Sequence, residues 1–190
     1  MKNTLRYVLH TQTYGIRYSK GCEFPNVIIC FVDASLHTCS VTGRAAYCII
    51  LFLNGGPVYW KCKLLPGKPS GSTLEAEYPA TYFATNETVY FRSLLYELGF
   101  PQDAPTVIYG DNAAAVQLAS EHRVTHDNRH INMKYHAMKW TTEQQVCKYV
   151  HVPSADNPAD IGTKIMPDRA AYLRFALTVC YDCLAQLDLK

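Results

Sequence analysis

The sequence reads Asn26-Val27-Ile28-Ile29-Cys30-Phe31-Val32-Asp33 at the point from which its architecture is easiest to work out. This run is apolar and rich in β-branched residues, which is typical of a strand buried on both faces. An acid follows the last apolar residue. The run therefore predicts a central strand whose carboxyl end carries a carboxylate, Asp33.

A hairpin is expected directly after this strand. Residues 44–53 and 58–63 are both strand-like, and Asn54-Gly55-Gly56-Pro57 joins them. Glycine adopts the positive φ that tight hairpin turns require. The two runs are therefore expected to pair as antiparallel strands.

A long helix should come next. Residues 64–72 contain prolines and glycines and are expected to form a loop, in which Ser72 or Thr73 can cap the following helix. Apolar residues then recur at close to helical spacing as far as Leu98, and Gly99 is a typical helix stop.

The second half of the chain repeats the pattern of an acid at a strand end. Residues 106–109 form a short apolar run that is followed by Gly110 and Asp111. The later elements are expected as a helix over 113–119, a helix ending near 143, a strand over 146–152, and helices over 155–164 and 168–187. This order predicts an α/β fold in which helices flank a mixed five-stranded sheet.

Composition places the chain among globular proteins. It has 190 residues, of which 48% are hydrophobic and 18% are charged, so one domain with one core is expected. No apolar run approaches the ~20 residues of a membrane span, and the first residues do not resemble a signal peptide. We therefore expect a soluble intracellular protein, cytoplasmic or nuclear. The net charge of +2 is small, so any affinity for nucleic acid must come from a local basic face or from metals.

Cysteines and histidines give weaker signals. The eight cysteines are scattered and are expected to be reduced. The one Cys-x-x-Cys, Cys180 to Cys183, has no second pair, so helix packing is preferred over a zinc or redox role. A zinc site is also conceivable at four histidines, although packing or hydrogen bonding explains them without a metal: His122, His126, His130 and His136.

Four acids occupy positions that a sheet could bring together, and they are Asp33, Glu77, Asp111 and Asp160. Clustered carboxylates repel one another, so they need cations to neutralise them. Hard oxygen ligands suit Mg²⁺ or Mn²⁺. Two such ions could activate a water and stabilise the leaving oxygen in a phosphoryl displacement.

Six segments, four of which contain these acids, resemble successive signatures of the ribonuclease H domain of copia-type LTR retrotransposon polyproteins, in the family's order and near its spacing. They are Phe31-Val32-Asp33-Ala34-Ser35, Gly55-Gly56-Pro57-Val58-Tyr59-Trp60-Lys61, Ser72-Thr73-Leu74-Glu75-Ala76-Glu77-Tyr78, Tyr109-Gly110-Asp111-Asn112-Ala113-Ala114, His130-Ile131-Asn132-Met133-Lys134-Tyr135-His136 and Asn157-Pro158-Ala159-Asp160-Ile161-Gly162-Thr163-Lys164. The residues before the first strand resemble the connection from reverse transcriptase to that domain. The resemblance thus covers nearly the whole chain.

The resemblance implies a ribonuclease H-like three-layer fold and an endoribonuclease that cleaves the RNA strand of RNA/DNA hybrids with two Mg²⁺ or Mn²⁺ ions. It also implies three segments: a linker over 1–24, the ribonuclease H-like domain over 25–165 and a C-terminal helical extension over 166–190. The implied partners are the hybrid and, within an element, reverse transcriptase or a larger nucleoprotein complex. A retrotransposon particle is then the expected location.

Carried over position by position, the resemblance makes Asp33, Glu77, Asp111 and Asp160 the catalytic metal ligands. Glu75 is the alternative to Glu77.

Five further residues are candidates for contact with nucleic acid. Thr73 and Asn112 could touch the sugar edge of the hybrid, and a helix cap is the alternative role for each. Three basic residues could contact phosphates, although a solvated face is the alternative: Arg123, Arg129 and Lys134.

Some features depart from the family pattern. Before the second strand, Val41-Thr42-Gly43-Arg44-Ala45-Ala46-Tyr47 replaces the usual Ser-Thr-Ser-Gly-Tyr, and the segment after the hairpin carries an extra residue. Pro79 lies two residues after Glu77 and should disturb the helix there, which would displace the carboxylate. The chain also lacks a reverse transcriptase portion, so it could be a fragment or a domesticated protein, even in an organelle. The alternative function is an inert scaffold or nucleic-acid-binding subunit with the same fold.

Overall fold

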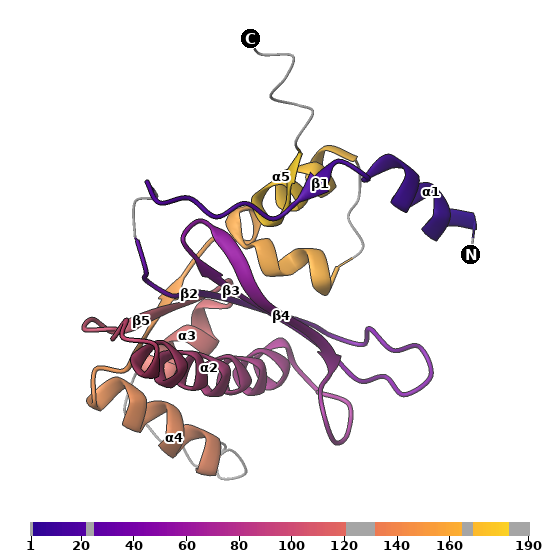
Figure 1. The fold of residues 1–190 in the computed structure, drawn as a ribbon. Coiled ribbons are helices and arrows are strands. Elements are labelled where there is room, and N and C mark those ends of the chain that lie inside the picture. The colour runs from indigo at the N-terminus through magenta and orange to yellow at the C-terminus, as the bar shows by residue number, and fades with distance from the viewer. Residues whose placement is uncertain (1, 22–24, 121–131, 165–168, 183–190) are drawn as a thin grey trace.

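A mixed five-stranded sheet forms the centre of the molecule (Figure 1). The computed structural model describes residues 2–21, 25–120, 132–164 and 169–182. In the spatial order β4-β3-β2-β5-β6, the strands are β4 (Gly56–Leu64), β3 (Ala46–Leu53), β2 (Ile29–Ser35), β5 (Thr106–Gly110) and β6 (Cys147–His151). Neighbouring strands among β2, β3 and β4 are antiparallel, whereas β5 and β6 run parallel to β2. The predicted sheet is confirmed.

The turn between β3 and β4 has the backbone that its sequence predicts. Asn54 has φ 53° and Gly55 has φ 81°. Two successive residues with positive φ are characteristic of the type I′ turn, whose twist matches that of paired strands. The predicted hairpin therefore forms at the expected place.

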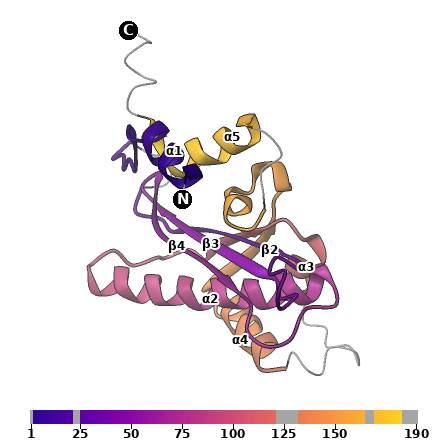
Figure 2. The ribbon, with the colours of Figure 1, turned by 90° about the vertical axis from the view of Figure 1, so that its right-hand side faces the viewer.

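Helices cover both faces of the sheet and complete three layers (Figures 1 and 2). One face is covered by α2 (Thr73–Glu97), α3 (Ala113–Ser120) and α4 (Asn132–Glu143). On the other side lie α1 (Lys2–His10), the 3₁₀ helices η2 (Ser154–Asp156) and η3 (Pro158–Gly162), and α5 (Arg169–Val179). Two short strands, β1 (Tyr14–Gly15) and β7 (Tyr181–Asp182), pair antiparallel beside them.

The side-chain alternation of β2 divides the core in two. Cys30, Val32 and Ala34 belong to the larger apolar cluster, which also contains buried residues of α2. Successive side chains of a strand point to opposite faces, so Phe31 and Asp33 face the side of η3. Phe31 packs in the smaller cluster together with Ala159 of η3. Asp33 is therefore directed at the layer that carries Asp160.

Helix α2 continues through Pro79, which corrects the expectation that this proline disturbs it. Ser72 is the N-cap, and its hydroxyl accepts a bond from the backbone N–H of Glu75. Proline cannot bond the carbonyl four residues before it. That carbonyl, of Glu75, accepts a bond from the Ser70 hydroxyl at 3.5 Å instead.

Two of the predicted helices are corrected. Residues 155–164 were expected to form one helix, but the structure has η2 and η3 with Asn157 in an extended conformation between them. The helix predicted over 168–187 ends at Val179, and Tyr181 and Asp182 form a strand. None of the helices in the described residues is both long and apolar enough to cross a membrane.

Candidate active site

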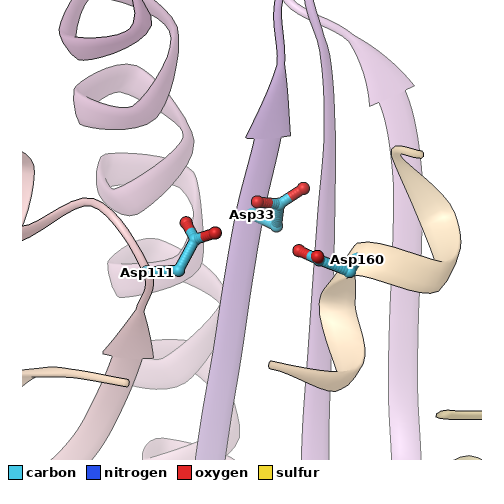
Figure 3. A group of neighbouring side chains, drawn as sticks. All are labelled: Asp33, Asp111 and Asp160. Carbon is cyan, nitrogen blue, oxygen red and sulfur yellow. The ribbon is translucent and has the colours of Figure 1, made fainter. Parts of the chain in front are cut away.

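Two aspartates meet because their strands are parallel neighbours. In the register of β2 with β5, Val32 is opposite Gly110. An aspartate follows each of these two residues in the sequence: Asp33 follows Val32 within β2, and Asp111 follows Gly110 directly after β5. Neighbouring parallel strands end at the same edge of a sheet, so the two carboxylates lie side by side (Figure 3).

Asp160 reaches the same edge from η3, and Asn157 fixes this helix to the sheet. The Asn157 side chain is fully buried. Its amide donates to the carbonyl oxygen of Val32 at 3.0 Å, and its Oδ1 accepts the backbone N–H of Ala159 at 3.2 Å. The same side chain therefore caps η3 and ties it to the residue before Asp33.

The three aspartates form a compact group in which the side chains point toward one another (Figure 3). One carboxylate oxygen from each of Asp33, Asp111 and Asp160 lies within 4.8 Å of those of the other two. Asp33 has no exposed surface and Asp160 only 6%. Such a set of hard, anionic oxygens fits a divalent cation such as Mg²⁺ or Mn²⁺.

Glu77 lies beside this group but does not belong to it. It is in the second turn of α2 and is 6% exposed. The alternative, Glu75, serves another purpose: its Oε2 accepts the backbone N–H of Gly71 at 2.7 Å, next to the helix cap. Of the two acids, Glu77 is the one that feels the charges of Asp33 and Asp111.

Lys164 contacts all three aspartates, although the sequence alone did not single it out. Its Nζ lies 2.8 Å from Asp160 Oδ1, 3.2 Å from Asp33 Oδ1 and 3.4 Å from Asp111 Oδ2. One ammonium thus pairs with all three aspartates. A sequence signal existed, because Lys164 is four residues after Asp160, a common spacing for ion pairs in helical turns.

Two hydroxyls complete the polar contacts of the aspartates. Ser154 donates to Asp111 Oδ2 at 2.5 Å, and Thr163 donates to Asp33 Oδ2. A ring nitrogen of His151 lies 3.1 Å from the Asp111 backbone oxygen. All three residues lie between the last residue of β6 and the C-cap of η3, residues 151–163, so this stretch orients the carboxylates as well as supplying Asp160.

Burial and mutual repulsion disfavour the ionised forms of Glu77 and Asp160. Burial, reinforced by the charges of Asp33 and Asp111, raises the pKa of Glu77 to about 9. Burial also raises the pKa of Asp160 to about 7, although its bond from Lys164 acts in the opposite direction. Burial opposes the charged form of Lys164, but the bond to Asp160 and the other aspartates outweigh it and raise its pKa. Additional positive charge would therefore stabilise the ionised site.

The polar residues proposed to touch nucleic acid have local roles in the fold. Asn112 Oδ1 accepts the backbone N–H of Ala115 at 3.0 Å, as a cap of α3 does. Thr73 is the first residue of α2, after the cap Ser72. Asn112 directly follows Asp111, and Thr73 lies four residues before Glu77. Their proposed contacts with a hybrid therefore stay predictions.

Several other residues predicted to have a functional role lie outside the part of the chain that the structure describes. Arg123 and Arg129 lie outside the described residues, as do His122, His126, His130 and Cys183. Lys134 belongs to α4, and His136 of the same helix is exposed. The phosphate contacts, the zinc alternative and the Cys-x-x-Cys therefore stay predictions.

Comparison with known sequences shows one consistent similarity. The chain is 31% identical over 176 residues to the retrovirus-related Pol polyprotein from transposon RE2 of Arabidopsis thaliana, an alignment that covers 93% of the chain and 12% of the polyprotein. It is also 31% identical over 114 residues to the corresponding polyprotein from transposon TNT 1-94 of Nicotiana tabacum, over 60% of the chain and 8% of the polyprotein. The chain thus spans about an eighth of the length of the first relative. No family model matches it.

Solved structures show the same fold. LC11-RNase H1, isolated from compost and solved in complex with an RNA/DNA hybrid, has a TM-score of 0.54 at 18% identity, over 72% of this chain and 93% of that one. RNase H1 of Halobacterium salinarum has a TM-score of 0.53 at 19% identity, with the same coverage. The mixed sheet and its flanking helices are therefore those of the ribonuclease H-like fold.

Proposed function

We propose that this chain, a ribonuclease H-like domain homologous to a segment of copia-type retrotransposon Pol polyproteins, is an endoribonuclease that cleaves the RNA strand of RNA/DNA hybrids. The observation that carries the proposal is the convergence of Asp33, Asp111 and Asp160 within 4.8 Å at one edge of the sheet. The three come from elements far apart in the sequence. Core packing alone does not favour burying acids so close together.

The proposed catalytic metal ligands are Asp33, Glu77, Asp111 and Asp160. Two Mg²⁺ or Mn²⁺ ions bound there would supply the Lewis acidity that activates water and stabilises the leaving oxygen. Asp33 and Asp111 would hold them from the sheet, and Asp160 from η3. Ser154 and Thr163 would keep the aspartates oriented. Glu77, whose pKa lies near 9, would ionise at neutral pH only when positive charge approaches it.

The hybrid would lie over this edge of the sheet. Thr73 and Asn112 flank the site at the starts of α2 and α3, and they are the proposed contacts to the sugars. Arg123, Arg129 and Lys134 are the proposed contacts to the phosphates. One solved neighbour was obtained with an RNA/DNA hybrid, which supports this substrate class. Reverse transcriptase within an intracellular retrotransposon particle is the proposed partner.

One observation favours the second candidate, a catalytically inert subunit with the same fold. Lys164 already bridges the three aspartates. If its ammonium stayed there permanently, it would keep divalent cations out of the site. The two candidates differ in whether a divalent cation can displace this ammonium.

The deciding experiment incubates the chain with an end-labelled RNA/DNA hybrid and Mg²⁺ or Mn²⁺. Asp111→Asn should abolish cleavage with the fold intact by circular dichroism. Asp103→Asn is the matched control, because Asp103 is an exposed aspartate at the opposite end of β5. DNA duplex and RNA duplex should not be cut. Equal absence of cleavage by the unaltered chain and Asp111→Asn, with both folded, would favour the inert subunit.

A further inference from the structure

Two cysteines lie directly opposite each other on the outer hairpin of the sheet. In the antiparallel register of β3 with β4, Cys48 is paired with Cys62. Opposed residues of antiparallel strands have Cα atoms about 4.5–5.5 Å apart, inside the range that disulfides span. The two sulfurs are 3.1 Å apart. They need to approach by only about 1 Å to reach the length of a disulfide bond.

The two thiols differ in access to solvent. Cys48 is 1% exposed, whereas Cys62 is exposed on β4, at the edge of the sheet. The Cys48 and Cys62 sulfurs lie within hydrogen-bonding distance of each other, and this contact lowers the pKa of the Cys62 thiol against the effect of partial burial. An accessible cysteine with thiolate character next to a second, resolving cysteine is the arrangement found in redox-sensitive proteins.

The pair also supports the helix that carries Asp160. A Cβ atom placed on Gly162 of η3 would lie 2.5 Å from Cys62 Sγ and 2.8 Å from Cys48 Cβ. Only glycine therefore fits against the two sulfurs. Cys48 is in turn the register partner of Asp33 on β2. The thiol pair thus touches both the strand and the helix that position the aspartates.

We propose that Cys48 and Cys62 form a reversible redox modification site that peroxide closes to a disulfide. The Cys62 thiolate attacks one oxygen of hydrogen peroxide, which gives Cys62 sulfenic acid and hydroxide. The Cys48 sulfur then attacks the sulfenic sulfur, its proton leaves with the hydroxyl group as water, and the disulfide forms. The two thiols lose two electrons in total, and peroxide takes them up. A dithiol restores the pair by exchange.

The disulfide draws the two sulfurs together beneath Gly162 and shifts the support of η3. If the proposed nuclease function holds, on which this consequence rests, cleavage of the hybrid falls on oxidation by roughly tenfold or more, since a misplacement of about 1 Å at a catalytic group costs on the order of a hundredfold. Reduction restores cleavage.

The experiment treats the full reduced chain with hydrogen peroxide and maps its disulfides by mass spectrometry without reduction. A linked Cys48–Cys62 peptide that disappears with dithiothreitol is expected. Cys48→Ser should leave the oxidised Cys62 unresolved, so that dimedone labels it. Cys62→Ser should prevent the linkage. Cys39→Ser is the matched control and should form the linkage as the unaltered chain does, because Cys39 lies in the loop before β3.

The outcomes separate the two proposals. If both cysteines stay reduced, or link to other cysteines instead of each other, the redox site is wrong whatever the chain cleaves. If the linkage forms but the reduced chain does not cut a hybrid, the redox site stands and the proposed nuclease fails. If the linkage forms and cleavage by the oxidised chain is unchanged, the coupling through Gly162 is wrong.

Discussion

Replacing Lys164 by methionine removes one ammonium and keeps most of the aliphatic stem. In the structure this ammonium is within 2.8–3.4 Å of three aspartate oxygens. We expect Lys164→Met to unfold more easily in EDTA, since the aspartates then lose their shared counter-charge. We also expect it to bind Mg²⁺ more tightly, because the ammonium and a divalent cation compete for the same oxygens.

The size of the stability loss follows from burial. Removing one partner of a buried ion pair costs about 3–5 kcal/mol. The Lys164 side chain is 37% exposed, whereas Asp33 is fully buried, so solvent screens part of the interaction. A loss of about 2 kcal/mol is therefore expected. With a urea m-value of about 2 kcal/mol/M, the midpoint of unfolding should fall by about 1 M.

The assay is urea unfolding in EDTA and in saturating Mg²⁺, together with calorimetric titration of Mg²⁺ without nucleic acid, at about pH 8, above the raised pKa of Asp160. Saturating Mg²⁺ should bring the variant close to the unaltered chain. Lys148→Met is the matched control, since Lys148 is an exposed lysine of β6. An unchanged midpoint in EDTA, or weaker Mg²⁺ binding by Lys164→Met, would refute the competition.

Three further changes test the supports of the site. The raised pKa of Glu77, about 9 against 4.5, means that the folded chain binds a proton there that the unfolded chain releases; the contribution of Glu77 to stability in EDTA should therefore be fully present below about pH 4.5 and be lost as pH rises toward 9, and Glu77→Gln should remove this part of the pH dependence in urea melts. Pro79→Ala should stabilise α2 by about 1–3 kcal/mol, because alanine restores the bond to the Glu75 carbonyl; a fall in thermal stability would contradict the account of Ser70 as a weak substitute. Asn157→Ala should cost about 1–3 kcal/mol, since it leaves the buried Val32 carbonyl without its partner, whereas a midpoint within error of the unaltered chain would show that η3 is held by other contacts.

The sheet was predictable because local sequence patterns indicate its strands and its turn. The apolar run before Asp33, the Asn-Gly turn at residue 54 and the short run before Asp111 each have one favoured backbone. The neighbourhood of Asp33 and Asp111 then follows from parallel pairing. The ligand set as a whole came from resemblance, because nothing local in Glu77 or Asp160 indicates that they approach the same edge.

The misses have physical reasons of two kinds. The break between η2 and η3 had a readable cause, because the residue before a proline avoids the helical region and Asn157 precedes Pro158. The strand at Tyr181 had none, since it exists by the pairing of Tyr181 with Gly15, far away in the sequence. Partners that distant contribute no local periodicity.

Lys164 connects the geometry of the site with its energetics. Three aspartates, Asp33, Asp111 and Asp160, pair with this single ammonium. Burial first, and neighbouring carboxylates after it, raise the pKa values of Glu77 and Asp160, so one ammonium does not compensate the charge of all four acids. A fold selected for stability alone would gain by replacing such acids with neutral residues. Keeping them costs stability that a bound divalent cation would return. This unfavourable charge balance supports the proposed binding of a divalent cation at this edge of the sheet, with Lys164 as the counter-charge of the aspartates in its absence.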